Sequence, residues 1–357
     1  MQPVIPHVDK ELLKKELTKE HFLRPTNKAN NEIYVVTAHN APHVMREIGR
    51  LRELSFRAWG GGTGNELDTD EYDFLEKPYY QLIVWDPEEE EIIGGYRFLP
   101  GSDICFDENG QPKFTMGHLF SFSEKFINEY LPYTLELGRA FVQPNYQSSK
   151  MGMKSLFALD NLWDGLGALI HRVKKARYFI GKVTIYNDYP PVARDLIYEY
   201  MRRFCPDTDK LIYPEENQSV ATVSKEHQLQ AEKIFLDKDA DTCYKILQKA
   251  VRAEGETIPT LINAYVGLTD TMRTFGTVRD FHFGSTYETG IMITMADLLE
   301  TKKKRYIEPY IEYMKLVLAE QREQRELRRQ ARKKRRESKK EEKNIVREKK
   351  KRKPKTE

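Results

Sequence analysis

Short apolar segments alternate with polar ones along most of the chain, and their spacing predicts both helices and strands. Residues 41–58 place apolar side chains three or four positions apart, which is typical of an amphipathic helix. These side chains are Val44, Ile48, Leu51 and Leu54. Farther on, YYQLIVWD and IIGGYRFLP flank PEEEE, and this arrangement predicts an antiparallel hairpin.

Similar patterns predict the other elements. Strands are expected at 32–38, 133–142, 177–185 and 289–295, and helices at 121–131, 151–174, 191–204 and 240–252. A short polar helix and a linker are expected before residue 32, and a helix from Leu298 onward. Because helices and strands do not alternate regularly, the order predicts an α/β domain with a mixed, largely antiparallel sheet flanked by helices.

The charge is unevenly distributed along the chain. The whole sequence has 58 Lys/Arg and 55 Asp/Glu, but residues 321–357 alone hold 19 basic and 7 acidic side chains. An acidic globular part is therefore followed by a strongly basic tail. Two interpretations of this tail stay open: a charged helix that frays into disorder, or a tether to anionic lipid headgroups. The tail lacks aromatic residues for base stacking, so nucleic acid is not the expected partner.

The composition does not indicate secretion or a membrane span. The N-terminus lacks an apolar h-region, and the most apolar stretch, 151–170, contains Lys154, Asp160 and Asp164. The three cysteines fit neither a zinc site nor a disulfide framework. We expect a cytoplasmic protein without a metal or a permanently bound cofactor, peripheral at the inner face of the membrane if the tail is a tether.

The segment RAWGGGTGNELDTDEYDF, residues 57–74, combines four glycines with five carboxylates. A phosphate-binding glycine loop follows a strand and opens a helix, whereas this segment follows a helix and leads into acidic residues. A calcium loop would use Asp68, Asp70 and Asp73, but the EF-hand order of ligands is missing. The remaining interpretations are a mobile, solvated loop and a flexible lid over an active site.

The residues around this segment resemble those of the acyl-homoserine-lactone synthases. That family has an Arg-x-x-x-Phe helix, a flexible loop, an Asp-x-x-Asp pair, an Arg-Leu-Leu-Pro-like strand and a Glu-x-x-Arg strand. The matching residues here are Arg52, Phe56, Asp70, Asp73, Arg97, Glu136 and Arg139. The family's loop tryptophan is not matched, because Trp59 lies too close to Phe56.

A second resemblance covers roughly residues 32–310. The motifs YQLIVWD, GGYRFLP, FSFSEKF, LELGRAFVQPNYQ, LWDGLGALI and YFIGKVTI resemble, in that order, the hemolysin-like N-acyltransferases, which make the first intermediates of ornithine and glycine lipids. The match continues through 258–294, with Leu261, Tyr265, Leu268, Asp280 and Phe283 at the family's positions. Both families have the GNAT fold, so the resemblance implies a GNAT-like core.

This resemblance suggests a division of the chain into five parts. They are an N-terminal helix and linker (1–31), the GNAT-like catalytic core (32–205), a helical insertion (206–256), the C-terminal part of the catalytic domain (257–310), and a helix with a basic, partly disordered tail (311–357).

The GNAT fold also implies where the acyl donor binds. The strands that carry ELGRAFV and YFIGKVTI splay apart, and the pantetheine arm of a thioester lies in the gap, where a strand amide polarises the thioester carbonyl. The residues expected to bind the acyl-pantetheine are Phe56, Phe141, Val142, Gln147, Gly152 and Glu124.

The segment QSSKMGM, residues 147–153, bears on the choice of donor. Lys150 replaces the first glycine of the loop that cradles the CoA diphosphate in GNAT enzymes, and a side chain there hinders close backbone approach. This departure favours acyl carrier protein (ACP), whose 4'-phosphopantetheine thioester has no adenosine diphosphate. The acidic carrier is expected to dock on basic residues, which are Lys150, Lys154, Arg172, Lys174 and Lys175.

N-acylation requires a neutral amine, so a base must remove a proton from the acceptor's ammonium. Glu136 is the first candidate, and the alternative for Glu136 is an ion pair with Arg139 or Arg52 that supports the sheet. Asp70 and Asp73 either hold the ammonium or clamp the lid through Arg52 and Arg97.

Other side chains also have candidate roles. Arg97 is also a candidate to bind the acceptor's carboxylate in a bidentate fork. Tyr189 and Tyr198 are candidates to protonate the leaving thiolate. His118 and His282 are interpreted as structural.

Together these features predict an acyl-ACP-dependent N-acyltransferase that joins a long acyl chain to an amino acid. The resemblance implies a 3-hydroxylated chain and a product used in aminolipid synthesis. Glycine is favoured as the acceptor, and ornithine is next. Two alternatives stay open: an acyl-homoserine-lactone-type synthase, and a non-catalytic module on a GNAT scaffold that binds a carrier protein or nucleic acid.

Overall fold

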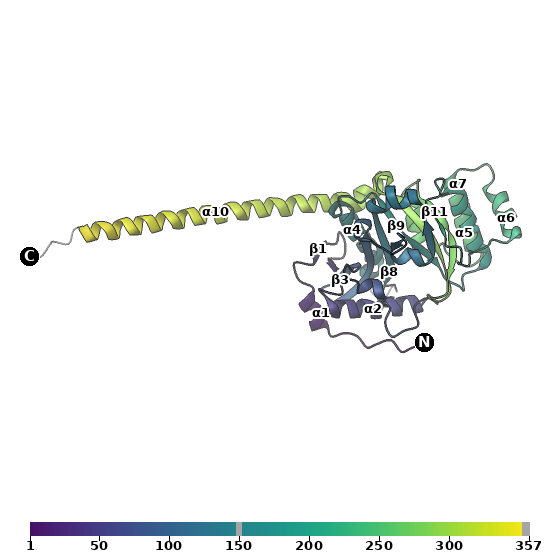
Figure 1. Ribbon diagram of the computed structural model, residues 1–357, viewed down its shortest axis with the longest axis horizontal. Coiled ribbons are helices and arrows are strands. Elements are labelled where there is room, and N and C mark those ends of the chain that lie inside the picture. Colours follow the sequence, from purple (N-terminus) through teal and green to yellow (C-terminus); the bar gives the residue numbers. More distant parts are fainter. Residues whose placement is uncertain (148–151, 352–357) are drawn as a thin grey trace, which may run out of the picture. The chain divides into compact units, whose positions relative to one another are not determined.

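A mixed sheet organises the unit Met1–Ile307 (Figure 1). The computed structural model describes residues 1–147 and 152–351. Within these residues, eight strands pair in the order β1-β2-β3-β4-β8-β9-β12-β11. Their bounds are β1 Phe22–Pro25, β2 Glu32–Val36, β3 Tyr80–Asp86, β4 Glu91–Pro100, β8 Thr134–Val142, β9 Tyr178–Ile185, β11 Arg273–Asp280 and β12 Thr286–Thr294.

Neighbouring strands of this sheet are antiparallel except β8 and β9, which run parallel. The expected mixed, largely antiparallel sheet is confirmed, and β3 and β4 form the hairpin predicted around PEEEE. Two short antiparallel pairs stand apart from the sheet. They are β5 (Cys105–Phe106) with β6 (Pro112–Lys113), and β7 (Phe120–Phe122) with β10 (Ile212–Pro214).

Helices cover both faces of the sheet. Helix α2 (Pro42–Arg57) contributes to the same apolar cluster as Ile83 of β3. Helix α4 (Met153–Arg172) lies against Leu82, since a Cβ added to Gly165 would lie 2.7 Å from that side chain. Successive side chains of a strand point to opposite faces, so α2 and α4 lie on opposite faces of the sheet.

The other helices are short or belong to the region between β9 and β11. They are α1 Lys10–Glu16, α3 Pro144–Gln147, α5 Pro191–Phe204, α6 Lys225–Phe235, α7 Ala240–Ala253, α8 Thr260–Val266 and α9 Glu300–Lys302. Tyr200 of α5 contacts the ring of Phe235 at 6.1 Å and that of Tyr244 at 5.2 Å, so α6 and α7 both pack against α5.

The sequence pattern does not predict β1 and β11, and it begins the helix of 121–131 too early. The first strand is only four residues long and ends in proline. Strand β11 has a bulge where Gly276 adopts φ +87°, which interrupts the alternation. Within 121–131 the chain first completes β7 and then forms a π-helical turn, η4 (Phe126–Tyr130), because Phe120 and Phe122 are buried as strand residues.

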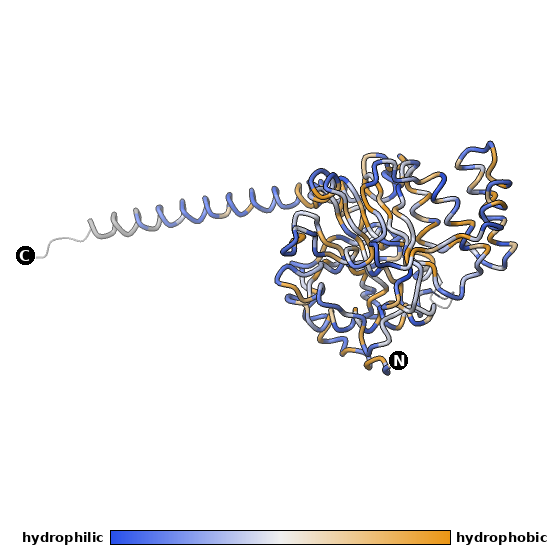
Figure 2. Tube along the Cα trace, turned by 45° about the vertical axis from the view of Figure 1, so that its right-hand side comes forward, coloured by the Kyte–Doolittle hydropathy of each residue, from blue (hydrophilic) through white to orange (hydrophobic). Residues whose placement is uncertain are grey.

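Helix α10 (Glu308–Lys351) belongs to the second unit. Figure 2 shows it as predominantly hydrophilic along its described length. Every side chain from Gln321 to Lys340 is exposed. None of the helices in the described part of the chain is long and apolar enough to cross a membrane.

Candidate active site

Strands β8 and β9 diverge in the middle of the sheet. They pair only between Thr134–Leu137 and Tyr178–Gly181. Beyond these residues β8 continues beside β4 to Val142, and β9 continues beside β12 to Ile185. The predicted splay of the two strands is confirmed, and we call the gap between Gly138–Val142 and Lys182–Ile185 the fork.

Glycine at position 181 allows the close approach of the strands at the base of the fork. A Cβ at this position would lie 2.5 Å from the carbonyl oxygen of Leu137, well inside van der Waals contact. A hollow at this point is lined by Leu137, Gly181, Lys182, Tyr265 and Ile291 together with Phe179, Ile180 and Ile293. Most of the side chains that line this small hollow are apolar.

A β-bulge orients Arg139 beside the fork. Gly95 pairs with Phe141 and Arg97 with Gly138, so β8 holds one residue more than β4 over this stretch. Arg139 adopts φ +47°, the conformation of a bulged residue. Its guanidinium lies 4.5 Å from the ring centre of Phe283, and its Nε donates to Asp68 Oδ1 at 3.1 Å.

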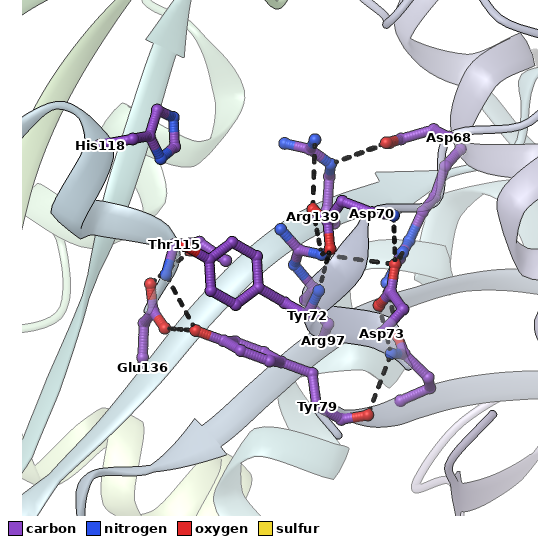
Figure 3. Close-up of polar contacts among 12 residues, drawn as sticks. Asp68, Asp70, Tyr72, Asp73, Tyr79, Arg97, Thr115, His118, Glu136 and Arg139 are labelled. Carbon is purple, nitrogen blue, oxygen red and sulfur yellow. Dashed lines mark hydrogen bonds and ion pairs between the residues drawn. The ribbon is translucent and has the colours of Figure 1, made fainter. Parts of the chain in front are cut away.

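A buried network of arginines and aspartates holds the end of the glycine-rich segment (Figure 3). Arg52 Nη1 lies 3.2 Å from Asp73 Oδ2, and Arg97 Nη1 lies 2.7 Å from Asp70 Oδ2. Gln81 Nε2 also donates to Asp73 at 3.0 Å. Burial would raise the pKa of Asp70, but the charges of Arg97 and Arg139 hold it below its usual value. The ion pairs by which Asp70 and Asp73 would clamp the glycine-rich segment to Arg97 and Arg52 are therefore present.

The ion pairs of this network occupy the side chains that two other interpretations require, namely an acceptor-binding Arg97 and a calcium loop. The Arg97 side chain is 2% exposed and pairs with Asp70 and Asp73, so it is not placed to bind an acceptor carboxylate. The three aspartates that a calcium loop would use pair with arginines. Within residues 1–147 and 152–351, no group of three or more His, Cys, Asp or Glu side chains is arranged to hold a metal ion.

The glycine-rich stretch is tied to a buried carboxylate. Glu53 of α2 is fully buried and accepts hydrogen bonds from the backbone amides of Thr63 and Gly64, at 3.0 and 2.8 Å. Burial would raise the pKa of Glu53, but these bonds and Arg57 lower it. These two backbone amides are therefore bonded to Glu53 and are not available to a phosphate group. Because Gly61 and Gly62 are buried, the stretch is not a fully solvated loop.

Glu136 is fully buried. Figure 3 shows its carboxylate beside the side chains of Tyr79 and Thr115. Its two carboxylate oxygens accept hydrogen bonds from the hydroxyl groups of Tyr79 and Thr115. Burial raises the pKa of Glu136, although both bonds oppose the rise. The alternative of an ion pair is wrong, because in the described structure Arg139 pairs with Asp68 and Arg52 with Asp73. The enclosure favours a positioning role over direct proton transfer.

We expect Glu136→Gln to slow turnover at least tenfold and to lower the free energy of unfolding by about 1–3 kcal/mol. The amide offers only one acceptor oxygen, so one buried hydroxyl group loses its partner. Steady-state kinetics and urea unfolding measure both effects. Tyr34→Phe is the control, because it removes a hydroxyl–carboxylate bond to Glu32 far from the fork. Unchanged turnover in Glu136→Gln would contradict this role.

The expected acyl-pantetheine residues are only partly brought together. Phe56 and Phe141 belong to one apolar cluster beneath α2. Gln147 Nε2 donates to the carbonyl of Val142 at 2.6 Å, and its Oε1 accepts from Trp59 at 3.1 Å, so the end of β8 is linked to the glycine-rich stretch. The remaining two are Gly152, which precedes α4 with φ +54°, and Glu124, which is exposed beyond β7.

The two tyrosines that are candidates to protonate the leaving thiolate make contacts with other parts of the protein. The hydroxyl group of Tyr189 donates to the carbonyl of Thr257 at 2.9 Å. Tyr198 is buried in α5 with its ring 6.4 Å from that of Tyr287. Tyr186, which immediately follows β9, lies closer to the glycine-rich stretch, because a Cβ on Gly61 would lie 2.9 Å from its ring. Burial raises the pKa of Tyr186.

The basic residues proposed for carrier docking do not form one face. Lys154 lies 2.8 Å from Asp86 and 3.0 Å from Glu88, so its charge is neutralised locally. Arg172, Lys174 and Lys175 are at the other end of α4, about 30 Å away along a helix of this length. Lys150 lies outside the described residues.

Several polar residues near the fork are not found by sequence reasoning. They are Tyr79, Thr115, Lys182 and Glu288, which lie on the α2 side of the sheet. Lys182 comes immediately after Gly181, the last residue of β9 that pairs with β8. Burial lowers the pKa of Lys182, and the nearby carboxylates of Glu288 and Asp280 oppose this. The available signal is the alternation along β9, which places Ile180, Lys182 and Thr184 on one face.

Comparison with known proteins gives this site its context. Residues 51–156 match the family model described as an acetyltransferase (GNAT) domain. The chain is 51% identical over 312 residues to a glycine N(alpha)-acyltransferase of Bacteroides thetaiotaomicron, which covers 87% of this chain and 91% of the relative. This chain belongs to the glycine N(alpha)-acyltransferase family. A second member, from Phocaeicola vulgatus, is 50% identical over 311 residues and is covered to 94%.

The chain is therefore an acyltransferase with a GNAT-type domain. A solved structure of a CoA-dependent acyl-homoserine lactone synthase, BjaI, aligns with 57% of this chain and 88% of its own, at 12% identity and a TM-score of 0.27. Similarity at this level supports no conclusion about fold or activity. The assignment of this glycine N(alpha)-acyltransferase family member rests on its two close relatives and on the GNAT domain.

Proposed function

We propose that this protein transfers a long acyl chain from acyl carrier protein to the α-amine of glycine. The observation that carries the proposal is the sequence identity of 51% and 50% to two glycine N(alpha)-acyltransferases over 87% of the chain. The open fork between β8 and β9 supports a pantetheine thioester as the donor. The 3-hydroxyl group of the acyl chain and the use of the product in aminolipid synthesis come from the resemblance to the hemolysin-like N-acyltransferases.

The charges near the fork favour glycine over ornithine. Ornithine would require a carboxylate for its second ammonium group. The described acidic side chains there already have partners: Asp68, Asp70 and Asp73 pair with arginines, and Glu288 accepts from Thr184 and Thr286. The Arg139 side chain is 19% exposed, its Nε pairs with Asp68, and its Nη2 lies 3.9 Å from Asp70, beyond hydrogen-bonding distance. This guanidinium is therefore the proposed anchor for the glycine carboxylate.

The chemistry follows from this placement. The neutral amine attacks the thioester carbonyl carbon, a C–N bond forms, and the C–S bond breaks with the electron pair leaving on sulfur. A β8 amide beyond Leu137 stabilises the developing oxyanion. The glycine-rich stretch excludes water, which would otherwise hydrolyse the thioester. Lys150, in place of a diphosphate-binding glycine, supports ACP as the donor.

Mass spectrometry of the products tests the proposal. Purified protein is incubated with 3-hydroxyacyl-ACP or the matching acyl-CoA, and with glycine, ornithine or S-adenosylmethionine. We expect N-(3-hydroxyacyl)glycine, formed faster from the ACP donor. An acyl-homoserine lactone would support the synthase alternative, and no acylated product from any acceptor would support the non-catalytic module.

We further propose that the basic tail 321–357 holds the enzyme at anionic membranes and that its removal abolishes vesicle binding. Each basic residue near such a surface contributes about 1 kcal/mol, and salt screens the attraction. Co-sedimentation with phosphatidylglycerol vesicles, with neutral phosphatidylcholine vesicles as the control, measures the effect. Equal binding of the full and truncated chains would contradict the tether.

A further inference from the structure

A second cluster of charged residues lies across the fork from the arginine–aspartate network. His118 ends the short helical turn η3 (Thr115–His118), whose first residue donates to Glu136 of β8. The imidazole Nε2 of His118 lies 3.6 Å from Oδ2 of Asp280 at the end of β11. This single turn therefore connects β8, on one side of the fork, with the strands on the other side.

His118 is the accessible member of this cluster. Its side chain is 43% exposed, whereas Asp280 is 6% exposed and Glu136 is fully buried. In the part of the chain that the structure describes, no residue hydrogen-bonds to Nδ1 of His118. Figure 3 shows the His118 ring apart from the Thr115–Glu136 contact.

The surroundings lower the pKa values of both His118 and Asp280. Burial lowers the pKa of His118, and the positive charges of Lys182 on β9 and Arg139 on β8 lower it further, against the effect of Asp280. Burial would raise the pKa of Asp280, but His118 and Lys182 bring it to about 2. The negative charges of Glu288 on β12 and Glu136 on β8 raise the pKa of Lys182, against the lowering by burial.

We infer that His118 is the general base that removes a proton from the ammonium group of the acceptor, and that Asp280 positions its imidazole. This inference rests on the proposed function. It replaces Glu136 as the base, because the carboxylate of Glu136 is enclosed and the imidazole of His118 reaches solvent.

The proton balance is complete without another reactant. His118 takes one proton from the ammonium group, the amine nitrogen then bonds to the thioester carbon, and the C–S bond breaks. Of the two protons left on nitrogen, one passes to the leaving thiolate and the other remains on the amide. Because His118 is partly exposed, it returns its proton to water, and one proton is released per turnover.

His118→Ala is expected to lower kcat/KM for glycine by 10²–10⁴-fold, the usual contribution of general base catalysis. Added imidazole is expected to restore part of the rate. His282→Ala is the matched control, because this exposed histidine contacts Asp280 only through its backbone amide, which the variant retains. The unfolding temperature of each variant shows whether the fold is intact.

Asp280→Asn provides a readout that a purely structural role would not give. The Asp280 carboxylate raises the pKa of His118, so its removal is expected to move the acid limb of the kcat/KM profile to lower pH and to reduce the plateau. A folded His118→Ala with near-normal rate, or a limb that does not move in Asp280→Asn, would overturn the inference. Absence of N-acylglycine from the unmodified enzyme would instead overturn the proposed function.

Discussion

Asp73→Asn is expected to lower the free energy of unfolding by about 3–5 kcal/mol, the usual cost of breaking a buried ion pair from one side. Asp73 is fully buried and lies 3.2 Å from Arg52 and 3.5 Å from Arg97, whose side chains are 1% and 2% exposed. Without the carboxylate, Arg52 loses its ion pair in the described structure, and Arg97 keeps its pair with Asp70. The end of the glycine-rich stretch then loses its anchor, so activity falls as well.

Chemical unfolding followed by circular dichroism measures this loss. Glu300→Gln is the matched control, since it breaks a solvent-exposed pair with Lys303 of 2.8 Å, and we expect no measurable change there. A loss below about 1 kcal/mol in Asp73→Asn would show that the network contributes little to stability and that the clamp interpretation is wrong.

Gly181→Ala is expected to lower kcat/KM at least 100-fold while the protein stays folded. The added methyl group would lie 2.5 Å from the carbonyl oxygen of Leu137, so the base of the fork must open or shift. Displacements of about 1 Å at a positioned thioester cost about 10²-fold in rate.

Gly267→Ala is the control for this variant. A Cβ there would meet its nearest neighbour, the carbonyl oxygen of Asn263, at 3.4 Å, which is ordinary contact. Both variants are compared by steady-state kinetics and thermal unfolding. If Gly181→Ala is as active as Gly267→Ala, the spacing of the strands at Leu137 does not control donor binding.

The parts of the fold with strong periodicity follow from the sequence. The spacing of Val44, Ile48 and Leu51 predicts α2, and the apolar segments around PEEEE predict the β3–β4 hairpin, because each buries one continuous face. Strand β11 is missed because its polar residues and the bulge at Gly276 hide the alternation.

The candidate site divides in a similar way. Motif order identifies Arg52, Asp73 and Arg97, which do meet in space. It does not identify Tyr79 or Thr115. The chain has 20 tyrosines, and the sequence around Tyr79 does not indicate that its hydroxyl group bonds to Glu136, 57 residues away. Such pairings depend on strand register, which local sequence patterns do not specify.

The interpretation of Glu136 shows the same limit. Its position on a central strand predicts burial correctly. Its partners are hydroxyl groups rather than the expected arginines, because η3 brings Thr115 over β8 and the bulge at Arg139 turns the nearest guanidinium toward Asp68.

A crystal structure with a non-hydrolysable acyl-pantetheine analogue tests the central claim most directly. The account predicts that the pantetheine arm lies between Gly138–Val142 and Lys182–Ile185, with the carbonyl oxygen within hydrogen-bonding distance of a β8 amide. His118 is expected on the side from which the acceptor amine attacks the carbonyl carbon. Density for the arm at any other place, with the fork empty, would contradict it.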